Sequence, residues 1–176
     1  MSTRKPQKKK PLTEAAIAPV DSSAFRKELL SHFTEENAHA DFDSTVKNFP
    51  ASLRGTRPND LPHSAWQLLE HLRIAQWDII EFALNSKHKS PEFPDGYWPT
   101  SPEPPDAQAW EKSIAAFRAD RKKFAAVLQK SDLLAPITHA NNQSLASKAI
   151  LIIDHDAYHL GQLVLLRRLL NIWNAA

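Results

Sequence analysis

The sequence contains no cysteine, only three glycines and no long uninterrupted run of apolar residues. Without cysteine there is no disulfide framework, thiolate metal ligand or cysteine nucleophile, so any metal site must use histidine or carboxylate side chains. A membrane-spanning helix needs roughly 18 or more apolar residues in succession, and the N-terminus lacks the apolar stretch of a secretion signal. We therefore expect a soluble, cytoplasmic protein that does not insert into a membrane.

Positive charge gathers at the N-terminus. Five of the 22 lysines and arginines lie in the first ten residues, which leaves 17 basic against 20 acidic side chains elsewhere. Residues 1–20 contain no aromatic ring on which a nucleic-acid base could stack. We interpret residues 1–20 as a disordered basic tail and residues 21–176 as a single domain, and we do not expect a nucleic-acid partner.

The scarcity of glycine and the position of the 13 prolines are typical of an all-α protein, because the prolines lie between segments of helical composition. Six prolines between residues 86 and 106 exclude a helix there and predict a long loop, pinned by Tyr97 and Trp98. Apolar periodicity predicts a four-helix bundle, with helices over residues 21 to about 48, 65 to about 85, about 107 to 130, and about 145 to 172.

Two of these helices carry further signals. Ser64 and Gln67 form a capping box, in which side chain and backbone satisfy each other at a helix start. The last helix has too broad an apolar band for a lone surface helix, so we expect it to lie centrally in the bundle.

Three histidines stand out by position. His155 and His159 are four residues apart, which places them one turn apart on the same helix face. That spacing alone is equally typical of two hydrogen-bonded polar residues. His71 is the candidate third ligand, because it lies in an apolar segment where a buried ring needs a partner.

Two segments of the chain resemble the DinB-like superfamily of damage-inducible, YfiT-type proteins: Ser64-Ala65-Trp66-Gln67-Leu68-Leu69-Glu70-His71-Leu72, and the stretch from Asp154 to Gln162. The resemblance spans about residues 24–173 and takes in Tyr97-Trp98-Pro99, Trp110 and Arg167-Arg168-Leu169-Leu170. It implies a four-helix bundle of the DinB/YfiT type, and it makes a homodimer an expectation.

The same resemblance implies a three-histidine metal site in which His71, His155 and His159 are the ligands. Three neutral imidazoles leave an ion its double positive charge and at least one coordination position for water or substrate. Imidazole ligands suit zinc, nickel, copper and iron, and we expect zinc first and nickel second.

Three carboxylates flank these histidines along the chain: Glu70, Asp154 and Asp156. Metal-bound imidazoles usually donate their other N–H to an acceptor, and these carboxylates are candidates for that role. Neighbouring helix positions point about 100° apart, so ordinary surface charge explains them equally well.

Two further polar residues lie near the ligands by helical spacing. Gln162 follows His159 by three residues and Asp78 follows His71 by seven, so either is a candidate contact to substrate or bound water. Hydrogen bonding between helices is the alternative role for both.

We do not expect the remaining histidines to be ligands. His39 and Asp43 have helical spacing but lie in a strongly polar segment, which favours a solvated face. Four others lie in polar or loop contexts typical of surface residues, namely His32, His63, His88 and His139.

The resemblance implies a metal-dependent enzyme acting on a small-molecule substrate by one of two chemistries. One is transfer or isomerisation with an external low-molecular-weight thiol held on the metal as thiolate; the other is hydrolysis by metal-activated water. No carboxylate is placed well enough to be named as the base, so the catalytic residues stay open. The alternative is a non-catalytic metal-binding or stress-associated bundle that acts through protein association.

Overall fold

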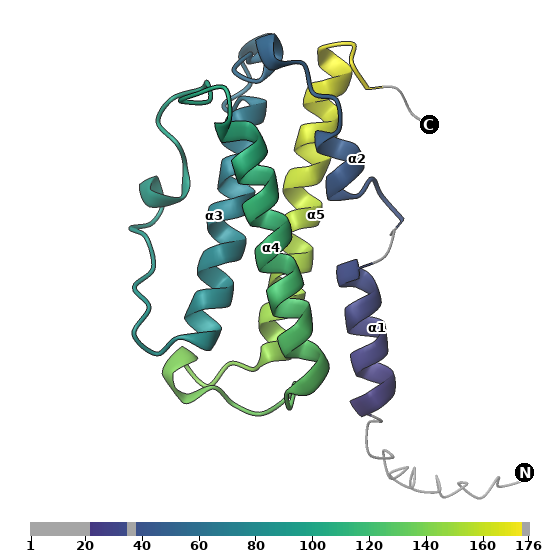
Figure 1. Cartoon of the computed structure of the whole chain (residues 1–176), viewed down its shortest axis with the longest axis vertical. Helices are drawn as coiled ribbons and strands as arrows, with labels where there is room; N and C mark the ends of the chain where they lie inside the picture. Colours follow the sequence, from purple (N-terminus) through teal and green to yellow (C-terminus); the bar gives the residue numbers. More distant parts are fainter. Residues whose placement is uncertain (1–21, 35–37, 174–176) are drawn as a thin grey trace, which may run out of the picture.

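Four long helices lie side by side in the computed structural model, which describes residues 22–34 and 38–173 (Figure 1). They are α1 (Ser22–Thr34), α3 (Ala65–Leu84), α4 (Ala109–Lys130) and α5 (Leu145–Leu169). A short helix, α2 (Phe42–Val46), follows α1, and the described residues contain no strand. The predicted all-α bundle is confirmed, whereas the predicted tail at residues 1–20 lies outside the described residues.

The N-terminal region corrects the sequence prediction of a single helix from residue 21 to about 48. Helix α1 covers Ser22–Thr34, residues 38–41 are not helical, and α2 starts afresh after Asp41. The Asp41 side chain accepts a hydrogen bond from the backbone N–H of Ser44 at 2.6 Å, and an aspartate in this position favours a new helix start. Asn48 then adopts a positive φ of 53°, which ends the segment before Pro50.

Helix α3 begins where the sequence predicts. The Ser64 hydroxyl accepts a hydrogen bond from Gln67 N–H, and the Gln67 side-chain oxygen accepts one from Ser64 N–H, each at 3.2 Å. This reciprocal cap fixes the first turn and therefore the position of His71 on the same helix. The other long helices also agree with prediction within about three residues at their ends.

The proline-rich loop between α3 and α4 runs alongside α3 (Figure 1). The Tyr97 hydroxyl donates to Asp78 Oδ2 at 2.7 Å, and Gln67 Nε2 donates to the Pro99 carbonyl at 2.9 Å. A short 3₁₀ turn, η3 (Asp95–Tyr97), lies between these anchors. These two hydrogen bonds hold the loop against α3 at two points along the helix. The loop therefore borders the site described below.

Two apolar clusters fill the bundle. The cluster nearer α2 includes Trp66, Trp110 and Leu163, and the other, towards the opposite end, includes Phe124 and Ile152. On α5 the stretch between Ile152 of one cluster and Leu160 of the other carries two of the three candidate histidines. These two histidines therefore lie between the two apolar clusters.

Helix α5 packs against α1, α2 and α3, but it is less central than the sequence predicts. Several large apolar side chains on one of its faces stay exposed, namely Ile150, Leu151, Tyr158, Leu165 and Leu169. Within the described part of the chain, α5 is the one helix long and apolar enough to cross a membrane by length and composition. It also carries buried polar side chains at Asp156, His159 and Arg167.

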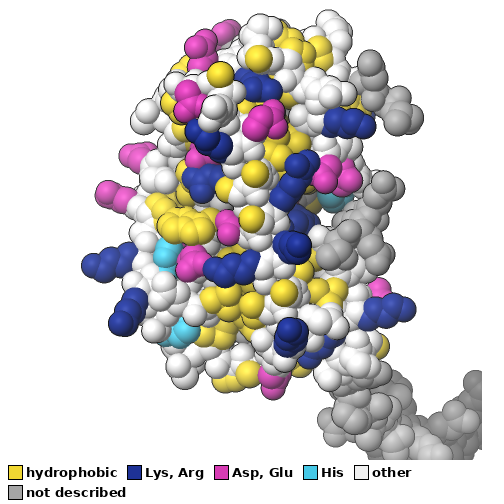
Figure 2. Space-filling model, viewed as in Figure 1, with side chains coloured by type: hydrophobic (Ala, Val, Ile, Leu, Met, Phe, Trp, Pro, Cys, Tyr) yellow, Lys and Arg dark blue, Asp and Glu magenta, His cyan; other side chains and the backbone are white. Residues whose placement is uncertain are grey.

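The surface seen in Figure 2 mixes lysine and arginine with aspartate and glutamate side chains. On this face the two signs alternate over short distances, so no continuous basic surface is presented there. Mixed charge of this kind does not create a strong field of one sign.

Candidate metal centre

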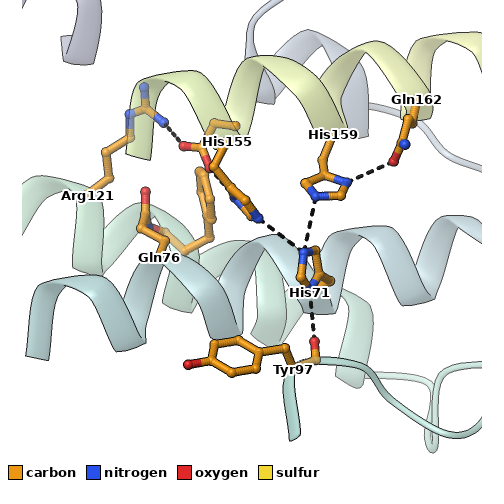
Figure 3. A network of polar contacts seen from close by, with 9 residues as sticks. His71, Gln76, Tyr97, Arg121, His155, His159 and Gln162 are labelled. Atoms are coloured by element: carbon orange, nitrogen blue, oxygen red, sulfur yellow. Dashed lines mark hydrogen bonds and ion pairs between the residues drawn. The ribbon is translucent and has the colours of Figure 1, made fainter. Parts of the chain in front are cut away.

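His71, His155 and His159 converge between α3 and α5 (Figure 3). The Nε2 atom of His71 lies 3.1 Å from Nε2 of His155 and 3.2 Å from Nε2 of His159. His71 and His159 are buried, and the His155 side chain is 22% exposed. The fold thus brings together residues that are 84 and 88 positions apart in the chain.

Hydrogen bonds at the far side of two rings fix which nitrogen faces the centre. His71 Nδ1–H donates to the Tyr97 carbonyl at 3.0 Å, and His159 Nδ1–H donates to Gln162 Oε1 at 2.8 Å. Because a carbonyl oxygen can only accept, the ring hydrogen lies on Nδ1 and each Nε2 presents a lone pair. Lone pairs that face one another repel, and a cation placed between them removes that repulsion.

The spacing of these atoms fits a metal ion. Zinc–imidazole bonds of about 2.0–2.1 Å in a tetrahedral site place neighbouring nitrogens roughly 3.3–3.4 Å apart. The two separations from His71, 3.1 and 3.2 Å, lie within about 0.2 Å of that value, and the three ligand nitrogens all lie within 4.8 Å of one another. The residues present therefore fit a divalent ion bound through three imidazoles.

Burial sets the charge of two of the rings. Burial lowers the pKa of His71 to about 4, although its hydrogen bond to the Tyr97 carbonyl opposes the shift. Burial likewise lowers the pKa of His159 to about 4, against the opposing effect of Gln162. Both imidazoles are neutral at pH 7, which is the form that binds a metal.

The sequence matches the model of one known protein family. The family model described as DinB superfamily matches residues 35–163, well over half of the sequence. The chain belongs to the DinB superfamily. Neither the curated proteins nor the solved structures searched gave a significant match. In this DinB-superfamily member, the matched range contains all three histidines and the proline-rich loop that borders the site.

Trp98 forms one wall of the three-histidine site. Its indole stacks on the His71 ring with 3.8 Å between ring centres and 2° between planes. His63 stacks on the opposite face of Trp98, again at 3.8 Å and with planes 11° apart. The sequence interpretation of His63 as a surface residue was wrong, because the ring is partly buried and its Nδ1 is enclosed. No local pattern links His63 to a tryptophan 35 positions later, so only the folded loop reveals the stack.

Of the three carboxylates considered as acceptors for a ligand imidazole, only Asp156 lies beside a candidate histidine. Asp156 is 2% exposed; its Oδ2 accepts from Arg121 Nη1 at 2.9 Å, and its Oδ1 lies 3.8 Å from His155 Nδ1. Burial raises the pKa of Asp156, while His155 and Arg121 oppose that shift. Asp154 is exposed, and Glu70 accepts hydrogen bonds from Arg73 and Ser113 instead of a histidine.

Gln162 and Asp78, the two candidate contacts to substrate or bound water, make different hydrogen bonds. Gln162 holds His159, as described, whereas Asp78 accepts from the Tyr97 hydroxyl and is paired with His88 Nε2, each at 2.7 Å. Asp78 therefore anchors the loop, and His88, expected at the surface, has a side chain only 7% exposed. His39 and Asp43 stay away from the three histidines and line a separate cavity of about 200 Å³ that Asp156 also borders.

Proposed function

We propose that this DinB-superfamily protein binds one divalent metal ion through Nε2 of His71, His155 and His159, and uses it on a small-molecule substrate. The observation that carries the proposal is the convergence of the three Nε2 atoms, at 3.1 and 3.2 Å from His71, with two ring hydrogens turned outward. Zinc is the first expectation and nickel the second.

The ion, when bound, supplies a Lewis acid with at least one open position, able to hold a thiolate or to acidify water. The protein contributes orientation and exclusion of water. The Tyr97 carbonyl and Gln162 fix the rotation of two ligand rings. Trp98 covers the face of His71 and keeps bulk water from that side.

The carboxylates near the site favour thiol transfer over hydrolysis. Hydrolysis by metal-bound water needs a nearby base to take the proton. Among the described residues, Asp78 is held by Tyr97 and His88, Asp156 by Arg121, and Glu70 by Arg73 and Ser113. A thiol would release its proton to solvent on binding the metal as thiolate, so its attack on an electrophile would need no such base, and the electrophile's leaving group would depart as an anion. We therefore place low-molecular-weight thiol transfer ahead of hydrolysis.

The test combines glutathione as a representative thiol with a chloro-dinitroarene as electrophile, and follows thioether formation by absorbance. We expect turnover that requires added zinc or nickel and falls at least about 100-fold in His155→Ala. The matched control is His139→Ala, which removes an exposed histidine outside the three-histidine cluster and should keep the activity. Equal metal-dependent turnover in His155→Ala and the unmutated protein would contradict the proposal.

The exposed face of α5 favours a second candidate function, in which the bundle acts through association with a second copy of itself. Leu151, Tyr158 and Leu165 are 45%, 66% and 51% exposed and recur every seven residues along one face. Such a stripe pairs well with its own copy across a two-fold axis. Leu165→Glu should shift the molar mass in light scattering from dimer to monomer, whereas Leu134→Glu, in an exposed loop, should not.

A further inference from the structure

The three histidines differ on the side that faces away from the centre. His71 and His159 each have an acceptor for Nδ1–H, at 3.0 and 2.8 Å. The Nδ1 atom of His155 is buried and has no hydrogen-bond partner in the described part of the chain. Asp156 Oδ1, 3.8 Å away, is also buried without a partner. A donor and an acceptor therefore lie side by side with the hydrogen bond between them not made.

The Asp156 carboxylate is held in place from behind. Its Oδ2 accepts from Arg121 Nη1 at 2.9 Å, while Arg121 Nε donates to the Phe33 carbonyl at 2.8 Å. The guanidinium also lies over the Phe33 ring, 4.9 Å from its centre. These contacts fix Arg121 to α1, and Arg121 in turn keeps the Asp156 carboxylate beside His155.

Leaving a buried carboxylate oxygen without a hydrogen-bond partner costs free energy, and the cost is larger for a charged group. An ion pair with Arg121 alone would not require the second oxygen to be enclosed next to an imidazole. The arrangement makes sense if the unpaired oxygen acquires its partner in another state of the protein. A shift of about 1 Å would bring His155 Nδ1 to the roughly 2.8 Å of a charge-assisted hydrogen bond.

We propose that Asp156 is the positioning residue for His155: in the metal-bound protein, His155 Nδ1–H donates to Asp156 Oδ1, and Arg121 holds the carboxylate. The inference rests on the proposed metal site. It gives all three ligands the same tautomer, each with Nε2 towards the ion. It also makes His155 the one ligand with an anionic partner, which raises the basicity of its Nε2 and strengthens its bond to the ion.

The test measures zinc affinity of the full chain by competition with a chromophoric chelator. Asp156→Asn keeps the shape of the side chain but removes its charge, and should weaken zinc binding about 10- to 100-fold. Asp154→Asn makes the same change at the exposed position on the other side of His155, and should alter affinity by less than about twofold.

The outcomes separate this inference from the proposed function. Wild-type zinc binding with unchanged affinity in Asp156→Asn would overturn the role of Asp156 and leave the metal site standing. Failure of the unmutated protein to bind zinc would overturn both.

A second measurement needs no variant, so it does not depend on Asp156→Asn folding. In zinc-bound protein labelled with ¹⁵N-histidine, the Nδ1–H of His155 should give a slowly exchanging resonance, further downfield than those of His71 and His159. The carboxylate acceptor is the reason for that order, because the other two acceptors are neutral. Rapid exchange of this proton, or zinc bound through Nδ1 of His155, would overturn the inference.

Discussion

The indole of Trp98 lies parallel to the imidazole of His71, with 3.8 Å between ring centres and 2° between the planes. The two residues come from different elements, since His71 is on α3 and Trp98 is in the proline-rich loop. The loop reaches this position because Tyr97, next to Trp98, is anchored through both its carbonyl and its hydroxyl. A charge placed on the His71 ring therefore acts directly on the indole of Trp98.

Trp98 should report metal binding by fluorescence. An ion on His71 draws electron density from the ring that stacks on the indole, so zinc should change the emission of metal-free protein. Trp98→Phe should remove most of that change. Trp77→Phe should keep it, because Trp77 contacts His88 and not a candidate ligand. An undiminished zinc response in Trp98→Phe would contradict the stacked arrangement.

The metal-free protein should lose stability as the pH falls from 6.5 to 4. The folded protein holds the pKa of His71 and His159 at about 4, against an ordinary value of 6.5, so the unfolded chain binds more protons in this window. The free energy of unfolding should fall by up to roughly 1.4 kcal/mol per pH unit for each ring, and this loss should be complete below about pH 4.

Urea titrations at several pH values, with chelator present, measure this slope. In the double variant His71→Gln, His159→Gln the part of the slope between pH 6.5 and 4 that these rings cause should disappear. Identical slopes in the two proteins would show that the buried rings do not resist protonation.

Tyr97→Phe should destabilise the fold by about 1–3 kcal/mol. The change removes the hydroxyl that donates to Asp78 Oδ2 and leaves part of a buried carboxylate without its partner. Tyr158→Phe is a matched control, since Tyr158 is 66% exposed and should change the free energy of unfolding by less than about 0.5 kcal/mol. Equal stability of both variants in urea would mean that Tyr97 does not anchor the loop.

Local signals in the sequence predict much of the helical framework. The capping box at Ser64 and Gln67 fixes the start of α3, and the spacing of His155 and His159 places both on one face of α5. The break after α1 was missed, because apolar spacing continues through it and the competing signal is a single aspartate cap at Asp41.

The surroundings of the candidate site follow less readily from sequence, since they depend on contacts between distant segments. Nothing near His63 indicates that it stacks on Trp98, and nothing near Asp156 indicates Arg121 as its partner. Spacing equally allowed Asp154, Asp156 and Glu70 beside the candidate ligands, and only packing separates them. His71 came from an apolar context and a family resemblance, and the fold brings its Nε2 to the other two.

The most direct test of the central claim is the metal content of the protein purified without a metal-affinity column and then equilibrated with zinc. Inductively coupled plasma mass spectrometry should find one zinc ion per chain, and none in the triple variant His71→Ala, His155→Ala, His159→Ala with its helical circular dichroism retained. A wild-type chain that holds no zinc, or a triple variant that holds as much as the wild type, would contradict it.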